Sequence, residues 1–286
     1  MGGDEGRIRI WQVLDGAILY STLGGNNFGV HTIAWSPDGT VFALGRENPE
    51  ISLRGPDGPG VGSSLEGHEQ AVRSVAFSPD SALLASGSDD QTVKLWRMAD
   101  RTLVTNFVDH IGPVTFSPDG RYLAMTRVDG RTDFYNLTNG LIEKTLEGGG
   151  SAIDFSPDGK ILGMVSGGLL KFWRVADGTL LQTYDQEVEG LAMCIDIAPN
   201  GKLFAYGRGD GAVIVARMPL VIDEITRFGN ETVLHWQGGT GLYQLQSRTN
   251  LMLGSWENLG GATTNTVATN LSSTTLFFRV QSLPNP

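Results

Sequence analysis

Short runs of apolar residues, several of them alternating with polar residues, fill most of the chain, and turn-forming residues separate one run from the next. Within residues 67–96, an alternating apolar run leads into FSPD, a second apolar run leads into SDD, and a third run ends at Trp96. Alternation with a period of two places neighbouring side chains on opposite faces, as in a β-strand with one buried face. The pattern therefore predicts an all-β protein built from many short strands.

The stretch GHEQAVRSVAFSPDSALLASGSDDQTVKLW, residues 67–96, is one copy of a unit that the chain repeats. Ser-Pro-Asp-Gly or a close variant marks each copy, and its proline stands at 37, 79, 118, 157 and 199, so that the spacings are 42, 39, 39 and 42 residues. A second marker ends another predicted strand at Trp11, Arg54, Trp96, Tyr135, Trp173 and Ala216. Two independent markers with the same period indicate an internal repeat of about 40 residues.

Each unit carries the signals of four antiparallel strands. Ser-Pro-Asp-Gly has the residues of a type I turn, because proline fixes φ at the second position and glycine closes the turn. The strand before the turn places two apolar residues on one face: Ile33 and Trp35, Val75 and Phe77, Val114 and Phe116, Ile153 and Phe155, and Ile195 and Ile197. Four short strands in about 40 residues are typical of a β-propeller blade. We therefore predict a β-propeller of four-stranded blades, with five complete repeats after an N-terminal partial repeat.

Residues 2–217 resemble the WD-repeat β-propellers, and the resemblance is most specific in residues 67–96, where a Gly-His pair, an Asp and a Trp match the family's pattern. It implies that His68, Ser86, Asp90 and Trp96 form a hydrogen-bonded tetrad that fastens one blade. The other copies depart from this pattern: blade one has Asn48 and Arg54 at the Asp and Trp positions, blade three keeps His110 and Asp129 but has Tyr135, blade four has Trp173 alone, and blade five keeps Asp210 but has Ala216. A tetrad in every blade is therefore not expected.

The chain begins in the middle of a repeat, because residues 2–11 (GGDEGRIRIW) align without a gap with residues 87–96 (GSDDQTVKLW). Two interpretations follow. In one, five blades close a ring and the strand near residues 18–23 completes the sheet of the last blade. In the other, the chain is the C-terminal part of a longer propeller, and an open blade edge could then associate with another molecule.

Composition changes after residue 218, which divides the chain into a predicted propeller (1–218) and a tail module (219–286). The tail is rich in Thr, Asn and Gly, and short alternating runs predict a small β-sandwich of about six strands. Trp236, Tyr243, Trp256 and either Phe277 or Phe278 are its predicted core aromatics. The tail resembles the fibronectin type III-like modules that end many bacterial proteins, often exported ones. The alternative is that these strands pack on the propeller as additional blade material.

Charge and composition exclude several kinds of function. The net charge of −10 and the lack of a basic stripe argue against nucleic-acid binding. The single cysteine, Cys194, precludes an intrachain disulfide and is predicted to be buried. No apolar run is long enough to span a membrane, and the acidic, polar N-terminus is not a secretory signal. Localisation is left open by the sequence, although the tail favours a place outside the cytoplasm if the N-terminus is incomplete. No motif indicates a cofactor or a metal.

The predicted function is a non-enzymatic scaffold that binds a protein or peptide partner on the rigid rim of the propeller. In the resembling family, contacts concentrate at the start of the first strand and before the turn Asp. The matching positions here are His31, Arg73, Ser151 and Met193, and Glu47, Asp89 and Val128. Two alternatives remain open: an enzyme of hydrolase, lactonase or lyase type that uses the central channel, and a surface carbohydrate-binding or adhesive protein that acts through the tail module.

Overall fold

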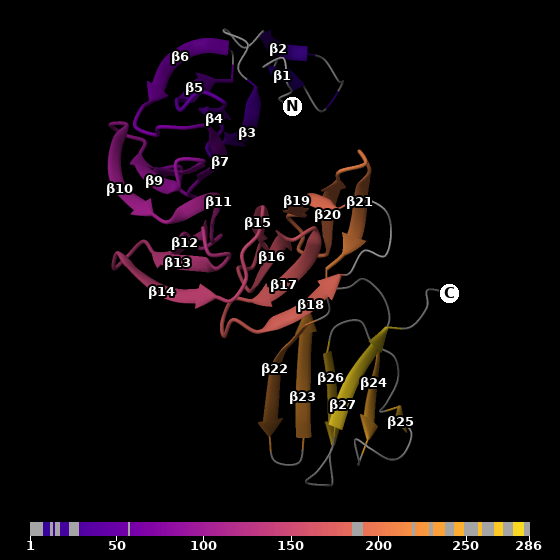
Figure 1. Cartoon of the computed structure of the whole chain (residues 1–286). Helices are drawn as coiled ribbons and strands as arrows, with labels where there is room; N and C mark the ends of the chain where they lie inside the picture. Colours follow the sequence, from indigo (N-terminus) through magenta and orange to yellow (C-terminus); the bar gives the residue numbers. More distant parts are fainter. Residues whose placement is uncertain are drawn as a thin grey trace. The chain divides into compact units, whose positions relative to one another are not determined.

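A computed structural model of the chain consists of β-strands joined by turns (Figure 1). The structure describes residues 8–11, 14, 18–22, 29–56, 58–184 and 191–218, and in the tail the backbone of the strands between residues 221 and 282. The chain divides into two compact units, Met1–Ile197 with Tyr206–Ile214, and Ala198–Ala205 with Val215–Pro286.

Five antiparallel sheets follow one another along the chain as the blades of a β-propeller, and four of them have four strands. Blade one is β3 (Val30–Trp35), β4 (Phe42–Arg46), β5 (Ile51–Gly55) and β6 (Gly58–Leu65). Blade two is β7 (Val72–Phe77), β8 (Leu83–Ser88), β9 (Thr92–Arg97) and β10 (Thr102–Val108). Blade three is β11 (His110–Phe116), β12 (Tyr122–Arg127), β13 (Thr132–Asn136) and β14 (Leu141–Leu146). Blade four is β15 (Ala152–Phe155), β16 (Ile161–Ser166), β17 (Leu169–Arg174) and β18 (Leu180–Tyr184). Blade five is β19 (Ala192–Ile197), β20 (Leu203–Arg208) and β21 (Val213–Arg217). The predicted all-β propeller fold is confirmed.

The Ser-Pro-Asp-Gly turn joins the first and second strands of the blades through one recurring set of hydrogen bonds. In blade one, Ser36 Oγ donates to Asp38 Oδ1 at 2.5 Å, and the same oxygen accepts the N–H of Thr40 at 3.0 Å. Blades two, three and four repeat both bonds, with serine-to-aspartate distances of 2.6, 2.6 and 2.7 Å. Gly39 closes the turn at a φ of 71°, a left-handed conformation that favours glycine. These bonds hold the first two strands of each blade in one hairpin geometry.

Blades pack on one another through the apolar pair of each first strand. In the core between blades one and two, Val75 and Phe77 of β7 lie against Ala43, Ile51 and Leu53 of the preceding blade. The same positions form the cores between blades two and three and between blades three and four. The predicted pairs of blades two to five are all buried, at 5–9% exposure.

Blade one is the exception, because Ile33 and Trp35 are 37% and 42% exposed. Strands β1 (Ile8–Trp11) and β2 (Ile18–Thr22) form a two-stranded antiparallel sheet that precedes this blade. Ile8 is buried against Phe42 and Leu44 of β4, so β1 covers part of the face of blade one. Strand β2 pairs with β1 and not with blade five, whose sheet has three strands among the described residues. The interpretation in which this strand completes the last blade is therefore wrong.

The tail contains two three-stranded antiparallel sheets. One has the strand order β22 (Val221–Phe228), β23 (Glu231–Gln237), β26 (Thr266–Asn270), and the other has the order β25 (Glu257–Asn258), β24 (Tyr243–Arg248), β27 (Phe277–Ser282). The predicted core aromatics of this module lie outside the described side chains, and the β-sandwich stays a prediction.

A half-buried carboxylate, that of Asp154, lies at the junction of blades four and five. Asp154 of β15 accepts a hydrogen bond from the backbone N–H of Ile197 on β19, at 2.7 Å. Burial raises the pKa of Asp154 from 3.8 to about 6, and the nearby carboxylate of Asp196 adds to this rise. The folded protein therefore binds a proton at Asp154 more tightly than the unfolded chain does.

We predict that Asp154→Asn stabilises the protein at neutral pH. Folding raises the pKa of this carboxyl group, so the protein becomes less stable as the pH rises from the pKa in the unfolded chain, 3.8, through the pKa in the folded protein, about 6. Asn keeps an acceptor for the Ile197 N–H but carries no charge. In urea unfolding, the free energy of unfolding of the variant should exceed that of the original protein by on the order of 2 kcal/mol at pH 7.5, and the two should be equal at pH 3.5. Asp196→Asn, at an exposed neighbour, should give a smaller gain, and a pH-independent effect of Asp154→Asn would contradict the assignment.

Candidate interaction site

Four predicted residues of blade two form one continuous chain of hydrogen bonds. Trp96 Nε1–H donates to Ser86 Oγ at 2.9 Å, and Ser86 Oγ lies 2.8 Å from Nε2 of His68. On the other side of the ring, His68 Nδ1 lies 2.8 Å from Asp90 Oδ2. The partners fix the tautomer: Nδ1 carries the proton that the carboxylate accepts, and Nε2 accepts the serine hydroxyl proton. Within this hydrogen-bonded network of four side chains, each of these polar atoms therefore has a partner.

The surroundings of this network hold the imidazole neutral and the carboxylate ionised. Burial lowers the pKa of His68, and the hydrogen bond and charge of Asp90 only partly offset this effect. For Asp90, burial raises the pKa, but hydrogen bonds from Thr92, the Glu69 N–H and His68 outweigh it and bring the pKa to about 2. These donors and acceptors all hydrogen-bond to one another within one blade. We therefore assign the network a structural role, which is to hold the strands of the blade together.

Blades one, three and four fill the position of Ser86 with the apolar side chains Leu44, Met125 and Met164, all fully buried. In blade four the indole N–H of Trp173 points at the sulfur of Met164, 3.1 Å away. None of these three side chains can link a tryptophan to a histidine as the Ser86 hydroxyl does in blade two.

Blade three builds a different network from the one its sequence suggests. His110 Nε2 lies 3.1 Å from Asp133 Oδ2, a carboxylate that also accepts from Arg127 at 3.1 Å and from Thr145 Oγ1 at 2.6 Å. Asp129, which the repeat alignment pairs with His110, instead binds Arg131 and Arg127. Asp133 lies within β13, so a comparison of turn positions does not find it.

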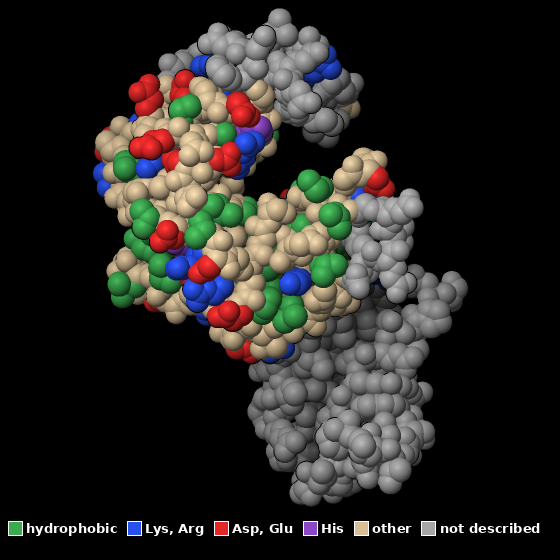
Figure 2. Space-filling model, in the orientation of Figure 1, with side chains coloured by type: hydrophobic (Ala, Val, Ile, Leu, Met, Phe, Trp, Pro, Cys, Tyr) green, Lys and Arg blue, Asp and Glu red, His purple; other side chains and the backbone are tan. Residues whose placement is uncertain are grey.

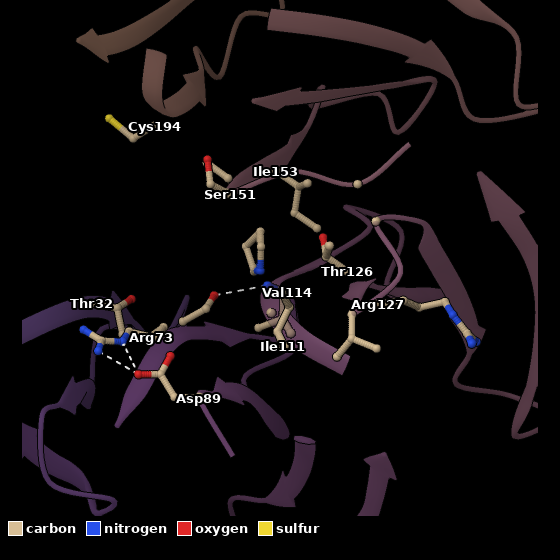
Figure 3. Close-up of a pocket in the computed structure, with 18 of the residues that line it drawn as sticks. Thr32, Arg73, Asp89, Ile111, Val114, Thr126, Arg127, Ser151, Ile153 and Cys194 are labelled. Atoms are coloured by element: carbon tan, nitrogen blue, oxygen red, sulfur yellow. Dashed lines mark hydrogen bonds and ion pairs between the residues drawn. The ribbon is translucent and has the colours of Figure 1, made fainter. Parts of the chain in front are cut away.

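A cavity of about 850 Å³ opens where the first strands of the blades begin. Figure 3 shows its lining residues, which come from blades one to five. Six of the seven predicted rim residues line it: His31, Arg73, Asp89, Val128, Ser151 and Met193. The seventh, Glu47, lies beside it and contacts Nε2 of His31 at 2.7 Å. All seven side chains are exposed, so the structure brings the predicted positions together around one opening.

One part of this opening, from blades one and two, carries a cluster of charged side chains. Arg73 holds Asp89 Oδ2 with two nitrogens, Nε at 2.8 Å and Nη2 at 2.7 Å (Figure 3). Arg73 Nη1 also lies 2.7 Å from His31 Nε2, and Glu47 is 4.0 Å from the same guanidinium nitrogen. The hydrogen bond that Arg73 donates to Asp89 raises the pKa of Arg73 further. In this cluster the two carboxylates of Glu47 and Asp89 face one guanidinium, that of Arg73.

The part of the opening that blades three to five supply carries exposed apolar side chains beside the polar Thr126, Arg127 and Ser151. Ile111, Val128 and Met193 line it at 39%, 45% and 60% exposure, and Leu191 beside them is 65% exposed. Glycines 112, 130, 149, 150 and 167 also line the cavity and leave the backbone open to an approaching chain. Figure 2 shows charged side chains around a histidine over β3 and β7, and hydrophobic side chains over β19 and β20.

Ile111, Gly112 and Pro113 of blade three also line the cavity. They were not predicted, because they do not stand at the contact positions of the WD-repeat family. The pairing of β11 with β12 shifts register between His110 and Val114, so these residues leave the regular strand and bend toward the opening. A Gly-Pro pair inside an otherwise alternating run was the available signal.

The prediction that Cys194 is buried is wrong, because the thiol is exposed and its residue lines the cavity. On β19, Ile195 and Ile197 are buried, whereas Cys194 and Asp196, which alternate with them, are exposed. A strand with one face against its neighbouring blade leaves alternate residues on its other face.

Among the residues that the structure describes, no three His, Cys, Asp or Glu side chains are grouped so that they could hold a metal ion. The same residues contain no helix with the length and apolar character needed to cross a membrane.

Comparison with known proteins agrees with this geometry. Residues 61–97 match the family model of the WD domain, G-beta repeat. A chain from a solved structure, "Crystal Structure of Mitotic Checkpoint Complex", superposes with a TM-score of 0.66 at 20% identity, over 76% of this chain and 70% of that chain. In all, 1473 chains of solved structures match, so the fold is too common to single out one function. No curated protein matches the sequence.

The protein is thus a β-propeller. The segment that matches the WD-repeat model, residues 61–97, contains the hydrogen-bonded network of His68 and Trp96.

We predict that Ser86→Ala destabilises the protein by about 2–3 kcal/mol, because it leaves the Trp96 N–H and His68 Nε2 buried without partners. Chemical denaturation at pH 7 measures this difference. Ser151→Ala, at an exposed serine of the cavity rim, is the matched control and should change stability by less than about 0.5 kcal/mol. Equal effects of the two variants would show that the network does not fasten the blade.

Proposed function

We propose that the protein is a non-enzymatic interaction scaffold that binds a protein or peptide segment at the cavity where the blades converge. The observation that carries this proposal is the arrangement of exposed side chains around one opening, with a charged cluster beside an apolar surface. A rigid stack of blades holds these residues in place before a partner arrives, which lowers the entropy cost of binding.

The composition of the opening favours a polypeptide partner. Ile111, Val128 and Met193 offer exposed apolar area of the kind that anchors a partner's hydrophobic side chain. Glu47, Asp89 and Arg73 offer carboxylates and a guanidinium for polar contacts at the edge. A volume of about 850 Å³ accommodates a few side chains of an extended segment. Such a mixture fits a peptide better than a sugar or a phosphate.

The arrangement of the titratable groups supports a binding role over catalysis. His31, Glu47, Asp89 and Arg73 are bound to one another and exposed to solvent. A general base or nucleophile is usually set in a partly buried environment that shifts its pKa toward its task. The enzyme and carbohydrate-binding interpretations remain the alternatives, and we propose that the tail module is a separate β-sandwich, of fibronectin type III type, that begins near residue 219.

We predict that Met193→Glu and Arg73→Glu weaken partner capture about tenfold or more, because each places a charge against the proposed contact surface. The assay is affinity capture from the native extract with quantitative mass spectrometry. Leu141→Glu is the matched control, since Leu141 on the outer strand β14 is 62% exposed and Met193 is 60% exposed.

Proteins that depend on the opening should be lost with both rim variants and retained with the control. If the original protein and both rim variants captured the same partner proteins, the proposal would be wrong. Enrichment of a glycan by the tail alone, on a glycan array, would favour the carbohydrate-binding alternative.

A further inference from the structure

Two buried threonines of blade three lie opposite each other on neighbouring strands, and their hydroxyl groups differ in what they bond. Thr126 of β12 and Thr132 of β13 are direct partners in the sheet, at 3% and 0% exposure. Thr132 Oγ1 donates a hydrogen bond to the backbone carbonyl of Gly148 at 2.7 Å. Thr126 Oγ1 is buried and has no hydrogen-bond partner among the described residues. A buried hydroxyl group without a partner costs stability, so its presence calls for an explanation.

Blades one, two and four show that the fold does not require this hydroxyl group. By the pairing of second with third strands, the residues that correspond to Thr126 are Gly45, Gly87 and Val165. Valine has the shape of threonine with a methyl group in place of the hydroxyl, and Val165 is fully buried. An apolar side chain of this shape therefore fits the position, and the hydroxyl group of Thr126 adds something that packing does not need.

The position of Thr126 directs its hydroxyl group to the wall of the cavity. Thr126 is among the residues that line the cavity, and Figure 3 shows its hydroxyl end pointing toward Ile153 of blade four. The methyl group packs on the loop that leads into blade four, because a Cβ atom at Gly149 would lie only 2.8 Å from Thr126 Cγ2. The loop thus holds the methyl group in place and leaves the oxygen on the side of the cavity.

The cavity wall beside Thr126 is formed largely by backbone. The point that a Cβ atom of Gly149 would occupy is also 2.8 Å from the carbonyl carbon of Gly130, so Gly130 borders the same place. Gly130 lines the cavity too, and a Cβ atom there would meet no other atom within 4 Å. A wall of glycines lets the main chain of a bound segment come close, because no side chain stands between the two backbones.

We propose that the Thr126 hydroxyl group donates a hydrogen bond to a backbone carbonyl oxygen of the segment that the cavity binds, and so positions that segment. This inference rests on the proposed function. The hydroxyl proton has no acceptor among the described residues of the free protein, and every residue of a peptide carries a carbonyl oxygen with two lone pairs. Recognition at Thr126 is therefore independent of the partner's side chains, which the rim contacts instead.

The first test compares Thr126→Val with Thr132→Val in the free protein by thermal unfolding. Thr126→Val should leave Tm unchanged or raise it, because the variant no longer buries an unpaired hydroxyl group. Thr132→Val is the matched control in the same blade and should lower Tm by about 3 °C or more, because it leaves the Gly148 carbonyl without its donor. Equal losses of Tm in the two variants would overturn the proposal, since Thr126 would then have a structural partner.

The second test measures binding. The probe is the tightest peptide that the full chain selects from a phage-displayed random library, made synthetically with a fluorophore, and its loss of binding to Met193→Glu places it at the cavity. By fluorescence anisotropy, Thr126→Val should bind this peptide about fivefold or more weakly, and Thr132→Val should differ from the original protein by less than about twofold.

Replacement of single amides of the peptide by esters then identifies the carbonyl group, because an ester carbonyl is a weaker acceptor. One such ester should weaken binding to the original protein and have little effect with Thr126→Val, where the hydrogen bond is already lost. Coupling of Thr126→Val to a side-chain change in the peptide, and to no ester, would overturn the assignment to the backbone.

The outcomes separate this inference from the function on which it rests. Equal affinity of the original protein and Thr126→Val for a peptide that Met193→Glu no longer binds would overturn the role of Thr126 and leave the binding function standing. If no selected peptide depends on Met193, the binding function itself is wrong, and the role of Thr126 is wrong with it.

Discussion

The contact on which the propeller depends is the burial of two apolar side chains from the first strands of blades two to five against the blade before. Val75 and Phe77 show this contact between blades one and two, and it recurs at the next junctions. Burying one such side chain contributes about 1.5–3 kcal/mol. The contact is not directional, so it tolerates the change from Val and Phe to Ile and Ile in blade five.

Hydrogen-bonded networks are added to this apolar framework and differ from blade to blade. Blade two links Trp96, Ser86, His68 and Asp90, whereas blade three gathers His110, Arg127 and Thr145 around Asp133. Blade four has only the contact of Trp173 with Met164. Because the apolar contact already sets where each blade lies, a polar network can vary without loss of the fold. The loops around the cavity can vary for the same reason, which suits a surface that binds a particular partner.

The sequence predicted the strands, the turns and the apolar pairs because each depends on neighbours within a few residues. Alternation alone identified Val75 and Phe77, and the positions of Arg73 and Met193 followed from the repeat. The exposure of Trp35 depends on the blade beside it and cannot be read from its own strand. Asp133 was missed because it lies within a strand, where blade two has Lys94. Ile111 was missed because a register shift in β11 turns it toward the cavity.

The neutral imidazole of His68 makes blade two the acid-sensitive part of the stack. Folding lowers the pKa of this ring below 6.5, chiefly through burial, so its contribution to stability is present at neutral pH and fades as acidity increases. Leu44, Met125 and Met164 occupy the corresponding place in blades one, three and four and take up no proton. Acidification would thus weaken the hydrogen-bonded network of blade two, the blade that also carries Arg73 and Asp89 at the cavity.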